Sequence, residues 1–130
     1  MSRDEALAYW FAADTHTYVA EEAGGVVGTY ILRPNQTGAG SHVANAAFMV
    51  RSDLQGSGIG RRMAEHCLSE AQRADFRAMQ FNFVVSTNTA AIHLWKQLGF
   101  KIVGTLPEAF HHREKGYADV YVMYRSLSDD

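Results

Sequence analysis

The amino-acid sequence predicts an α/β (α+β) domain in which a mixed, mostly antiparallel central sheet is flanked by helices. Two observations lead to this fold class. Short runs that alternate apolar and polar residues, as strands do, are interspersed with segments in which apolar residues recur at helical spacing. In addition, an apolar run that ends at Val50 passes through a glycine-rich turn directly into a helical pattern. We therefore expect one domain over residues 1–130, with the order helix, three strands, helix, strand, helix and two strands.

Three helices are expected from their capping residues and from the spacing of their apolar residues. Ser2 and Glu5 have the spacing of a capping box, which opens the first helix. The third helix begins at Thr87 or Asn88, and Gly99 ends it. The expected ranges are 2–13, 58–73 and 88–98, and the apolar face of the second helix consists of Ile59, Met63, Cys67 and Ala71.

Six strands are expected from alternation and from the turn residues between them. A tight turn joins the first two strands into an antiparallel hairpin, and a polar loop over residues 107–116 precedes the last strand. One face of the fourth strand should carry its apolar side chains, which are Met79, Phe81, Phe83 and Val85. The expected strand ranges are 17–21, 26–32, 42–50, 78–85, 101–106 and 118–126.

The glycine-rich turn Gln55-Gly56-Ser57-Gly58-Ile59-Gly60 is the most informative motif. Its glycines allow positive φ and a close approach of the backbone to a ligand. The first N–H groups of the helix that follows have no intrahelical partner and carry the positive end of the helix dipole, which suits a phosphate or pyrophosphate. A turn that merely lets the helix pack closely on the sheet would have similar glycines, so this alternative stays open. A P-loop is excluded, because Arg61 and Arg62 stand where it needs Lys and Ser or Thr, and the spacing does not fit the dinucleotide fingerprint.

Composition restricts the classes of function. The chain has 47% hydrophobic residues and only 2 prolines, which indicates a folded core, and its net charge of −2 provides no basic field for nucleic acid. The single cysteine, Cys67, suits a reducing compartment. No apolar run has the length of a membrane span and no signal peptide is recognisable, so we expect a cytoplasmic protein without a membrane partner. Histidines without H-x-x-x-H spacing predict no metal site.

Two segments together resemble the GCN5-related N-acetyltransferase (GNAT) family. The glycine-rich turn matches the family's Q/R-x-x-G-x-G/A signature for acetyl-coenzyme A (acetyl-CoA). The segment Asn88-Thr-Ala-Ala-Ile-His-Leu-Trp95-Lys-Gln-Leu-Gly-Phe100 resembles N-x-x-A-x-x-L-Y-x-x-x-G-F. The resemblance covers roughly Thr17 to the C-terminus and implies a GNAT fold, acetyl-CoA as donor and an amine as acceptor. Family members usually begin with a further strand and helix, so we expect a shortened N-terminus whose exposed sheet edge favours a homodimer.

The resemblance also implies which residues would hold acetyl-CoA. Backbone N–H groups from Gln55 to Arg61 would bind the pyrophosphate. The strand end Phe48-Met49-Val50 would pair with the pantetheine arm and present an N–H group to the thioester oxygen, where negative charge develops. Asn88 would contact the cofactor near the thioester, although it can equally be a plain helix cap. Trp95 occupies the cofactor-contacting position at which the family commonly has a tyrosine, its usual general acid. An indole cannot serve as that acid, so the general acid stays open.

A narrower resemblance is to the branch that contains the yeast azetidine-2-carboxylate N-acetyltransferase, which acts on small imino and amino acids. It is carried by the stretches Phe81–Asn88 and Leu94–Phe100 together with Asn45. In that branch the asparagine matching Asn45 is at the reacting centre, and those matching Asn82 and Asn88 contact the cofactor. From the residues alone, Asn45 is the lone polar residue of an apolar strand and needs either a structural partner or a ligand.

The expected function is therefore N-acetylation of a small amino or imino acid, or a related amine, by direct attack on acetyl-CoA in a ternary complex. Within the same class, the alternative is acetylation of a protein N-terminus or a lysine. Outside it, the alternative is a coenzyme A-binding sensor or structural subunit without turnover, which the tryptophan at position 95 would suit. His111 and His112 are weaker candidates for a role in the acceptor site.

Overall fold

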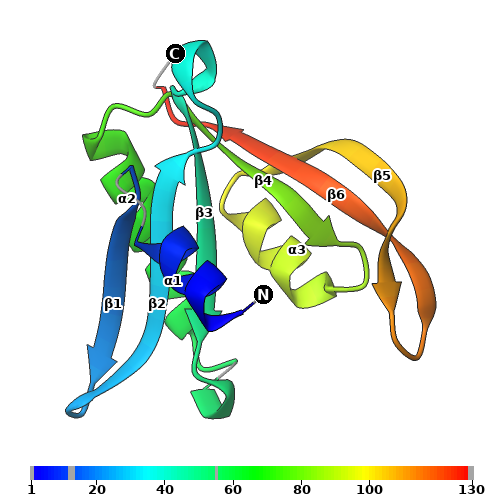
Figure 1. The fold of residues 1–130 in the computed structure, drawn as a ribbon, viewed down its shortest axis with the longest axis horizontal. Helices are drawn as coiled ribbons and strands as arrows, with labels where there is room; N and C mark the ends of the chain where they lie inside the picture. Colours follow the sequence, from blue (N-terminus) through cyan, green and yellow to red (C-terminus); the bar gives the residue numbers. More distant parts are fainter. Residues whose placement is uncertain (1, 12–13, 55, 129–130) are drawn as a thin grey trace.

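The computed structural model describes residues 2–11, 14–54 and 56–128, without the side chains of residues 6, 9 and 10. Its elements follow the expected order (Figure 1). They are α1 (Arg3–Trp10), β1 (His16–Glu22), β2 (Gly25–Pro34), β3 (Val43–Val50), α2 (Ile59–Arg73), β4 (Ala78–Val85), α3 (Thr89–Gln97), β5 (Lys101–His112) and β6 (Gly116–Ser126), with 3-10 turns at Gly38–Gly40 and Ser52–Leu54.

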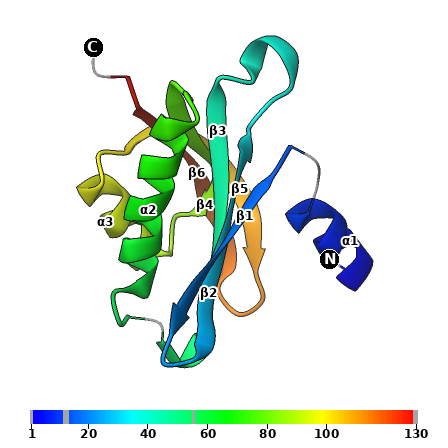
Figure 2. The same cartoon turned by 90° about the vertical axis from the view of Figure 1, so that its left-hand side faces the viewer.

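The strands form one six-stranded sheet in the order β1-β2-β3-β4-β6-β5. The β3–β4 pair is parallel and the other four pairs are antiparallel, which confirms the predicted mixed, mostly antiparallel sheet. Figure 2 shows α2 and α3 on one face of the sheet and α1 on the opposite face. We call these the α2 face and the α1 face. Among the described residues, no helix is long and apolar enough to cross a bilayer.

The core lies between the sheet and α2. All four residues of the predicted apolar face of α2 are buried, and they pack with inward side chains of β2, β3 and β4. Under α3, the rings of Phe81, Trp95 and Phe100 form a second part of the same core. Burial of these aromatic and aliphatic groups is the main contribution that holds both helices on the sheet.

The predicted helix caps are present. Ser2 and Glu5 form the capping box of α1. Asn88, rather than Thr87, caps α3, because its Oδ1 accepts from the backbone N–H of Ala91 at 3.2 Å. Gly99 ends that helix with φ +93°, a conformation that favours glycine.

The predicted loop over residues 107–116 was wrong except for a turn over residues 113–115. β5 continues to His112 and pairs with β6 as a long hairpin, so His111 and His112 lie on a strand. The pairing is interrupted between Leu106 and Phe110, and within that interruption the backbone N–H of Glu108 is bonded to Asp119 Oδ1 at 3.0 Å. This edge strand is mostly exposed, which explains why its sequence has the polarity of a loop.

The predicted apolar face of β4 was wrong beyond Phe81. Phe81 pairs with Met123 and Val84 with Tyr121, so β4 contains one more residue than β6 between these pairs, which is a β-bulge. The alternation therefore shifts by one position. Val84 is buried, whereas Phe83 is 55% exposed.

We expect Cys67 to be unreactive in the native protein. Its side chain is fully buried on α2, and burial raises the pKa of its thiol to about 12. Because the thiolate is the reactive species, a chromogenic disulfide reagent at pH 8 should modify the native thiol at least about 100-fold more slowly than the thiol of the unfolded chain. Absorbance with and without guanidinium measures this ratio, and comparable rates would contradict the buried placement.

Candidate functional site

The main opening of the sheet lies where β3 and β4 separate. The two strands pair only at Val43–Ala78 and Ala44–Met79, and beyond these pairs they diverge. The divergence forms a cavity of about 560 Å³ between the two strands and α3, which we call the cleft. Its lining residues are Asn45, Ala46, Ala47, Phe48, Phe81, Asn82, Phe83, Val84, Val85, Asn88, Ala91 and Trp95.

Divergence leaves the cleft side of β3 without a partner strand. On its other side, β3 pairs with β2 along its whole length, from Ala44 to Val50. Towards β4, no backbone pair follows Ala44 among the described residues. An extended ligand that carries amide groups can bond to such an edge as an added strand would.

Asn45 joins the two strands at the point where their pairing ends. Its Nδ2 donates a hydrogen bond to the backbone oxygen of Gln80 at 2.9 Å. The sequence left open whether Asn45 has a structural partner or a ligand, and the structure supplies the structural partner. The same side chain lines the cleft, and in the described part of the chain its Oδ1 has no hydrogen-bond partner.

Asn82 belongs to a chain of three amides on the α1 face. Its Nδ2 donates to Asn35 Oδ1 at 2.6 Å, and its Oδ1 accepts from Gln80 Nε2 at 2.9 Å. Asn35 directly follows β2, so these bonds reach across β3 and connect the end of β2 with β4. The amide of Asn82 is thereby held in a fixed orientation beside the cleft.

Aromatic rings form the α3 side of the cleft. The ring centroid of Trp95 lies 5.4 Å from that of Phe48 and 4.4 Å from that of Phe81. Asn88 lies on the same side, where it both caps α3 and lines the cavity. Of the predicted site residues, the structure therefore brings five together in one cavity: Asn45, Phe48, Asn82, Asn88 and Trp95.

The glycine-rich turn follows the open end of β3 and starts α2. Gly56 and Gly58 have φ of +84° and +89°, and a Cβ at either position would meet no atom within 4 Å. Backbone conformation, rather than crowding against the sheet, is therefore the reason for glycine at both positions. Gly58 is the N-cap of α2 and offers no side-chain acceptor to the first N–H groups of the helix. Gln55 lies outside the described residues.

The remaining predicted residues lie around this turn and not in the cleft lining. Arg61 Nη1 donates to Gln97 Oε1 at 2.8 Å, which ties the start of α2 to the end of α3. Met49 is exposed. Val50 lies beside the first turn of α2, since a Cβ added at Gly60 would be 3.9 Å from Val50 Cγ2. Ser57 Oγ donates to the backbone oxygen of Leu54, and Ile59 is buried in the core.

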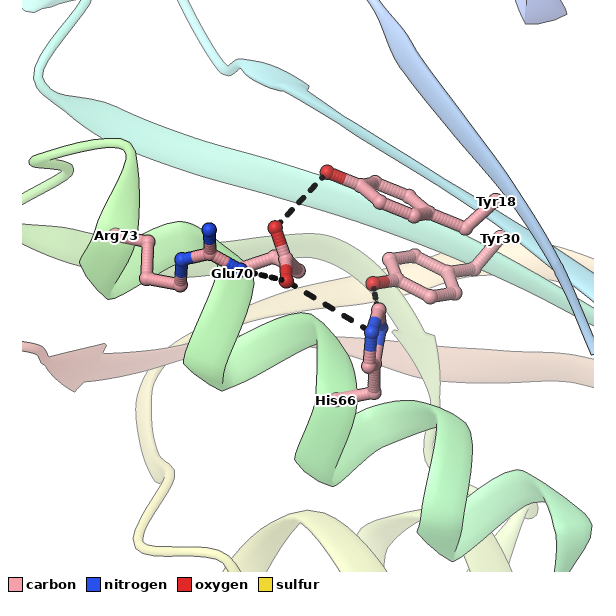
Figure 3. A network of polar contacts seen from close by, with 5 residues as sticks. All are labelled: Tyr18, Tyr30, His66, Glu70 and Arg73. Atoms are coloured by element: carbon pink, nitrogen blue, oxygen red, sulfur yellow. Dashed lines mark hydrogen bonds and ion pairs between the residues drawn. The ribbon is translucent and has the colours of Figure 1, made fainter.

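A polar network that sequence reasoning missed anchors α2 to the β1–β2 hairpin (Figure 3). Tyr30 is only 2% exposed, and its Oη lies 2.6 Å from His66 Nδ1. Burial raises the pKa of Tyr30, so its hydroxyl stays protonated while it is hydrogen-bonded to the imidazole. Tyr18 stacks on Tyr30 and donates to Glu70, which also pairs with Arg73. The i, i+4 spacing of His66 and Glu70 was a visible signal, but their tyrosine partners are remote in sequence.

A second cavity, of about 440 Å³, lies beside this network between α2 and β1, with Arg62 at its lining. Arg62 forms an ion pair there with Glu22. In the residues that the structure describes, no group of three or more His, Cys, Asp or Glu side chains is arranged to hold a metal ion.

Comparison with protein families gives one match over most of the chain. Residues 2–100 match the acetyltransferase (GNAT) family. The chain is 34% identical to N-acetyltransferase aca1 of Schizosaccharomyces pombe over 108 residues, which are 80% of this chain and 52% of that protein. It is 30% identical to L-amino acid N-acyltransferase MnaT of Escherichia coli over 104 residues, or 76% of this chain and 60% of that protein. The chain thus spans between half and two thirds of the length of these two relatives.

Solved structures share the whole fold. A GCN5-related N-acetyltransferase from Kribbella flavida is 43% identical, with a TM-score of 0.92 over 97% of this chain and 77% of that one. The putative acetyltransferase yncA from Salmonella typhimurium, whose structure was solved with its cofactor acetyl-CoA, is 25% identical, with a TM-score of 0.85 over 100% of this chain and 76% of that one.

We expect Asn45→Ala to lower the free energy of unfolding by about 1 kcal/mol, because it removes the hydrogen bond to the Gln80 oxygen. Urea unfolding followed by circular dichroism measures the change. Ser57→Ala, which removes a hydrogen bond in the exposed turn, is the control and should cost less. An Asn45→Ala protein as stable as the wild type would show that the bond contributes nothing to joining β3 and β4.

The Tyr30–His66 hydrogen bond should give unequal single-variant effects. His66→Ala leaves the buried Tyr30 hydroxyl without its partner and should cost about 2 kcal/mol, whereas Tyr30→Phe leaves a half-exposed imidazole that water can reach and should cost about 1 kcal/mol. A double-mutant cycle by urea unfolding should give a coupling near 1 kcal/mol. Tyr18→Phe, which loses only a 3.4 Å bond, is the control. Strict additivity would contradict the network.

Proposed function

This chain belongs to the acetyltransferase (GNAT) family, as the two sequence motifs predicted, and we propose that it transfers an acetyl group from acetyl-CoA to the amine of a small amino or imino acid. The observation that carries the proposal is the free edge of β3, which opens on a cavity of about 560 Å³ and ends at the N-terminus of α2. The names of two relatives support it: MnaT is an L-amino acid N-acyltransferase, and yncA has acetyl-CoA as its cofactor.

The residues around the cleft fit the parts of acetyl-CoA. The backbone N–H groups from Gly56 to Arg61, at the positive end of the α2 dipole, suit a pyrophosphate. The free edge of β3 from Phe48 to Val50 suits the two amide groups of a pantetheine arm. The rings of Phe48 and Trp95, which both line the cavity, suit its apolar segments.

Catalysis in this proposal comes from alignment and from fixed hydrogen-bond donors. Acetyl-CoA would supply a thioester, with a thiol of pKa about 8.5 as the leaving group. A backbone N–H of β3 would stabilise the charge that develops on the thioester oxygen, at no cost of reorganisation. Asn45, held by the Gln80 backbone, would orient the acceptor amine from the α1 face. Asn82, held by Gln80 and Asn35, would contact the cofactor, as the resemblance implies. Because the leaving thiolate is a weak base, turnover does not require an acid at position 95.

The test is release of free thiol from acetyl-CoA with a panel of amino acids, imino acids, polyamines and short peptides. We expect turnover with a small amino or imino acid, and a loss of at least about 10-fold in kcat for Asn45→Ala with unchanged acetyl-CoA affinity. Tyr30→Phe is the control, because it is expected to be about as destabilised as Asn45→Ala, but the lost hydroxyl bonds to His66 on α2 and Tyr30 does not line the cleft.

The outcomes separate the alternatives. Turnover with peptides alone would indicate a protein N-terminal or lysine acetyltransferase. Tight acetyl-CoA binding without turnover on any amine would indicate a binding subunit, which Trp95 at the position of the family's usual tyrosine would suit. Failure to bind acetyl-CoA would overturn the proposal altogether.

A further inference from the structure

A row of polar residues crosses the α1 face of the sheet at the point where β3 and β4 separate. The connections that define it are the pair Arg33–Asn45, the hydrogen bond from Asn45 to the Gln80 backbone, and the pairs Gln80–Tyr124 and Tyr124–Lys101. We call these five residues the polar row. It spans five strands, from β2 to β5, and has a cation at each end.

The side chains of the polar row share one face because of strand alternation. Four of the five residues directly follow a buried residue in the sequence, so their side chains point to the opposite face of the sheet. The fifth, Lys101, shares that face because it pairs directly with Tyr124. The buried neighbours, which point into the core on the α2 face, are Leu32, Ala44, Met79 and Met123. The polar row is therefore on the α1 face, opposite α2.

Arg33 is the end of the polar row that lies close to the cleft. It is directly opposite Asn45 in an antiparallel pair, where Cβ atoms are about 5 Å apart. Asn45 itself lines the cleft. Lys101 is three strands from Asn45, or about 14 Å at the usual spacing between strands. Of the two cations, only Arg33 is near enough to contact a small molecule whose amine is in the cleft.

We infer that Arg33 binds the carboxylate of the acceptor and so selects free α-amino and α-imino acids over amines and peptide termini that lack a nearby carboxylate. This inference rests on the proposed function. A guanidinium group binds a carboxylate through two parallel hydrogen bonds, with a defined orientation. In an α-amino acid the amine and the carboxylate share one carbon atom. Fixing the carboxylate on β2 therefore directs the amine across Asn45 and towards the cleft.

The test compares Arg33→Gln with the matched control Lys101→Gln, which removes the cation at the far end of the polar row. Acceptors are L-alanine and L-proline, each beside its carboxamide, with thiol release as the readout. We expect Arg33→Gln to raise KM for the two acids by about 10- to 100-fold. It should leave KM for acetyl-CoA and for the carboxamides within about 2-fold, and Arg33→Lys should restore part of the loss. Lys101→Gln should change no KM by more than about 2-fold.

Two results would overturn the inference. An equal rise in KM for acids and carboxamides in Arg33→Gln would mean that Arg33 acts on structure only. A rise in KM for the acids in Lys101→Gln alone would mean that Arg33 does not bind the carboxylate. If the wild type acetylates none of the four acceptors, the proposed function fails for this substrate class. The anchor is then judged by calorimetric binding of N-acetylalanine in the presence of coenzyme A. Weaker binding to Arg33→Gln than to the wild type supports the anchor, and equal binding or none overturns it.

Discussion

The structure depends on a parallel strand pair that is only two residues long. β3 and β4 must stay in one sheet, because a continuous core runs beneath both, yet they must also separate to leave a cleft. Asn45 reconciles these requirements, since its side chain continues the connection for one more residue after the backbone pairing ends. Beyond that point the ring of Phe48 on β3 contacts those of Phe81 on β4 and Trp95 on α3, so that aromatic packing replaces the hydrogen bonds that divergence removes.

The second constraint is the position of α2 relative to the open end of β3. The turn that joins them needs positive φ at Gly56 and Gly58, and the helix is held on the sheet by its buried face and by the Tyr30–His66 contact. The first turn of α2 therefore stays beside the end of β3, where a Cβ at Gly60 would lie 3.9 Å from Val50 Cγ2. Anion binding at this turn would thus be a consequence of how the helix is anchored.

Local signals in the sequence predicted most of the fold, and they failed where register decides the outcome. The capping box at Ser2, the cap at Asn88 and the apolar face of α2 depend on residues a few positions apart, and all were confirmed. The bulges that expose Phe83 and lengthen β5 depend on β6, which a single strand's pattern cannot reveal. The partners of Asn45 and Tyr30 are likewise 35 and 36 residues away, so sequence could mark these side chains as unusual without naming what they bind.

The divergence of β3 and β4 also means that the sheet consists of two halves with a weak seam between them. One half is β1–β3 with α2, and the other is β4–β6 with α3. In the described residues, the two strands at the boundary share only two backbone pairs, and side-chain bonds such as Asn45–Gln80, Asn82–Asn35 and Arg61–Gln97 supply further connections. A ligand that bonds to the edge of β3 and packs on α3 contacts both halves, so its binding would stabilise their association. Occupancy and folding are then thermodynamically linked, and at a ligand concentration of 100 times Kd the linkage amounts to about 2.7 kcal/mol of added stability.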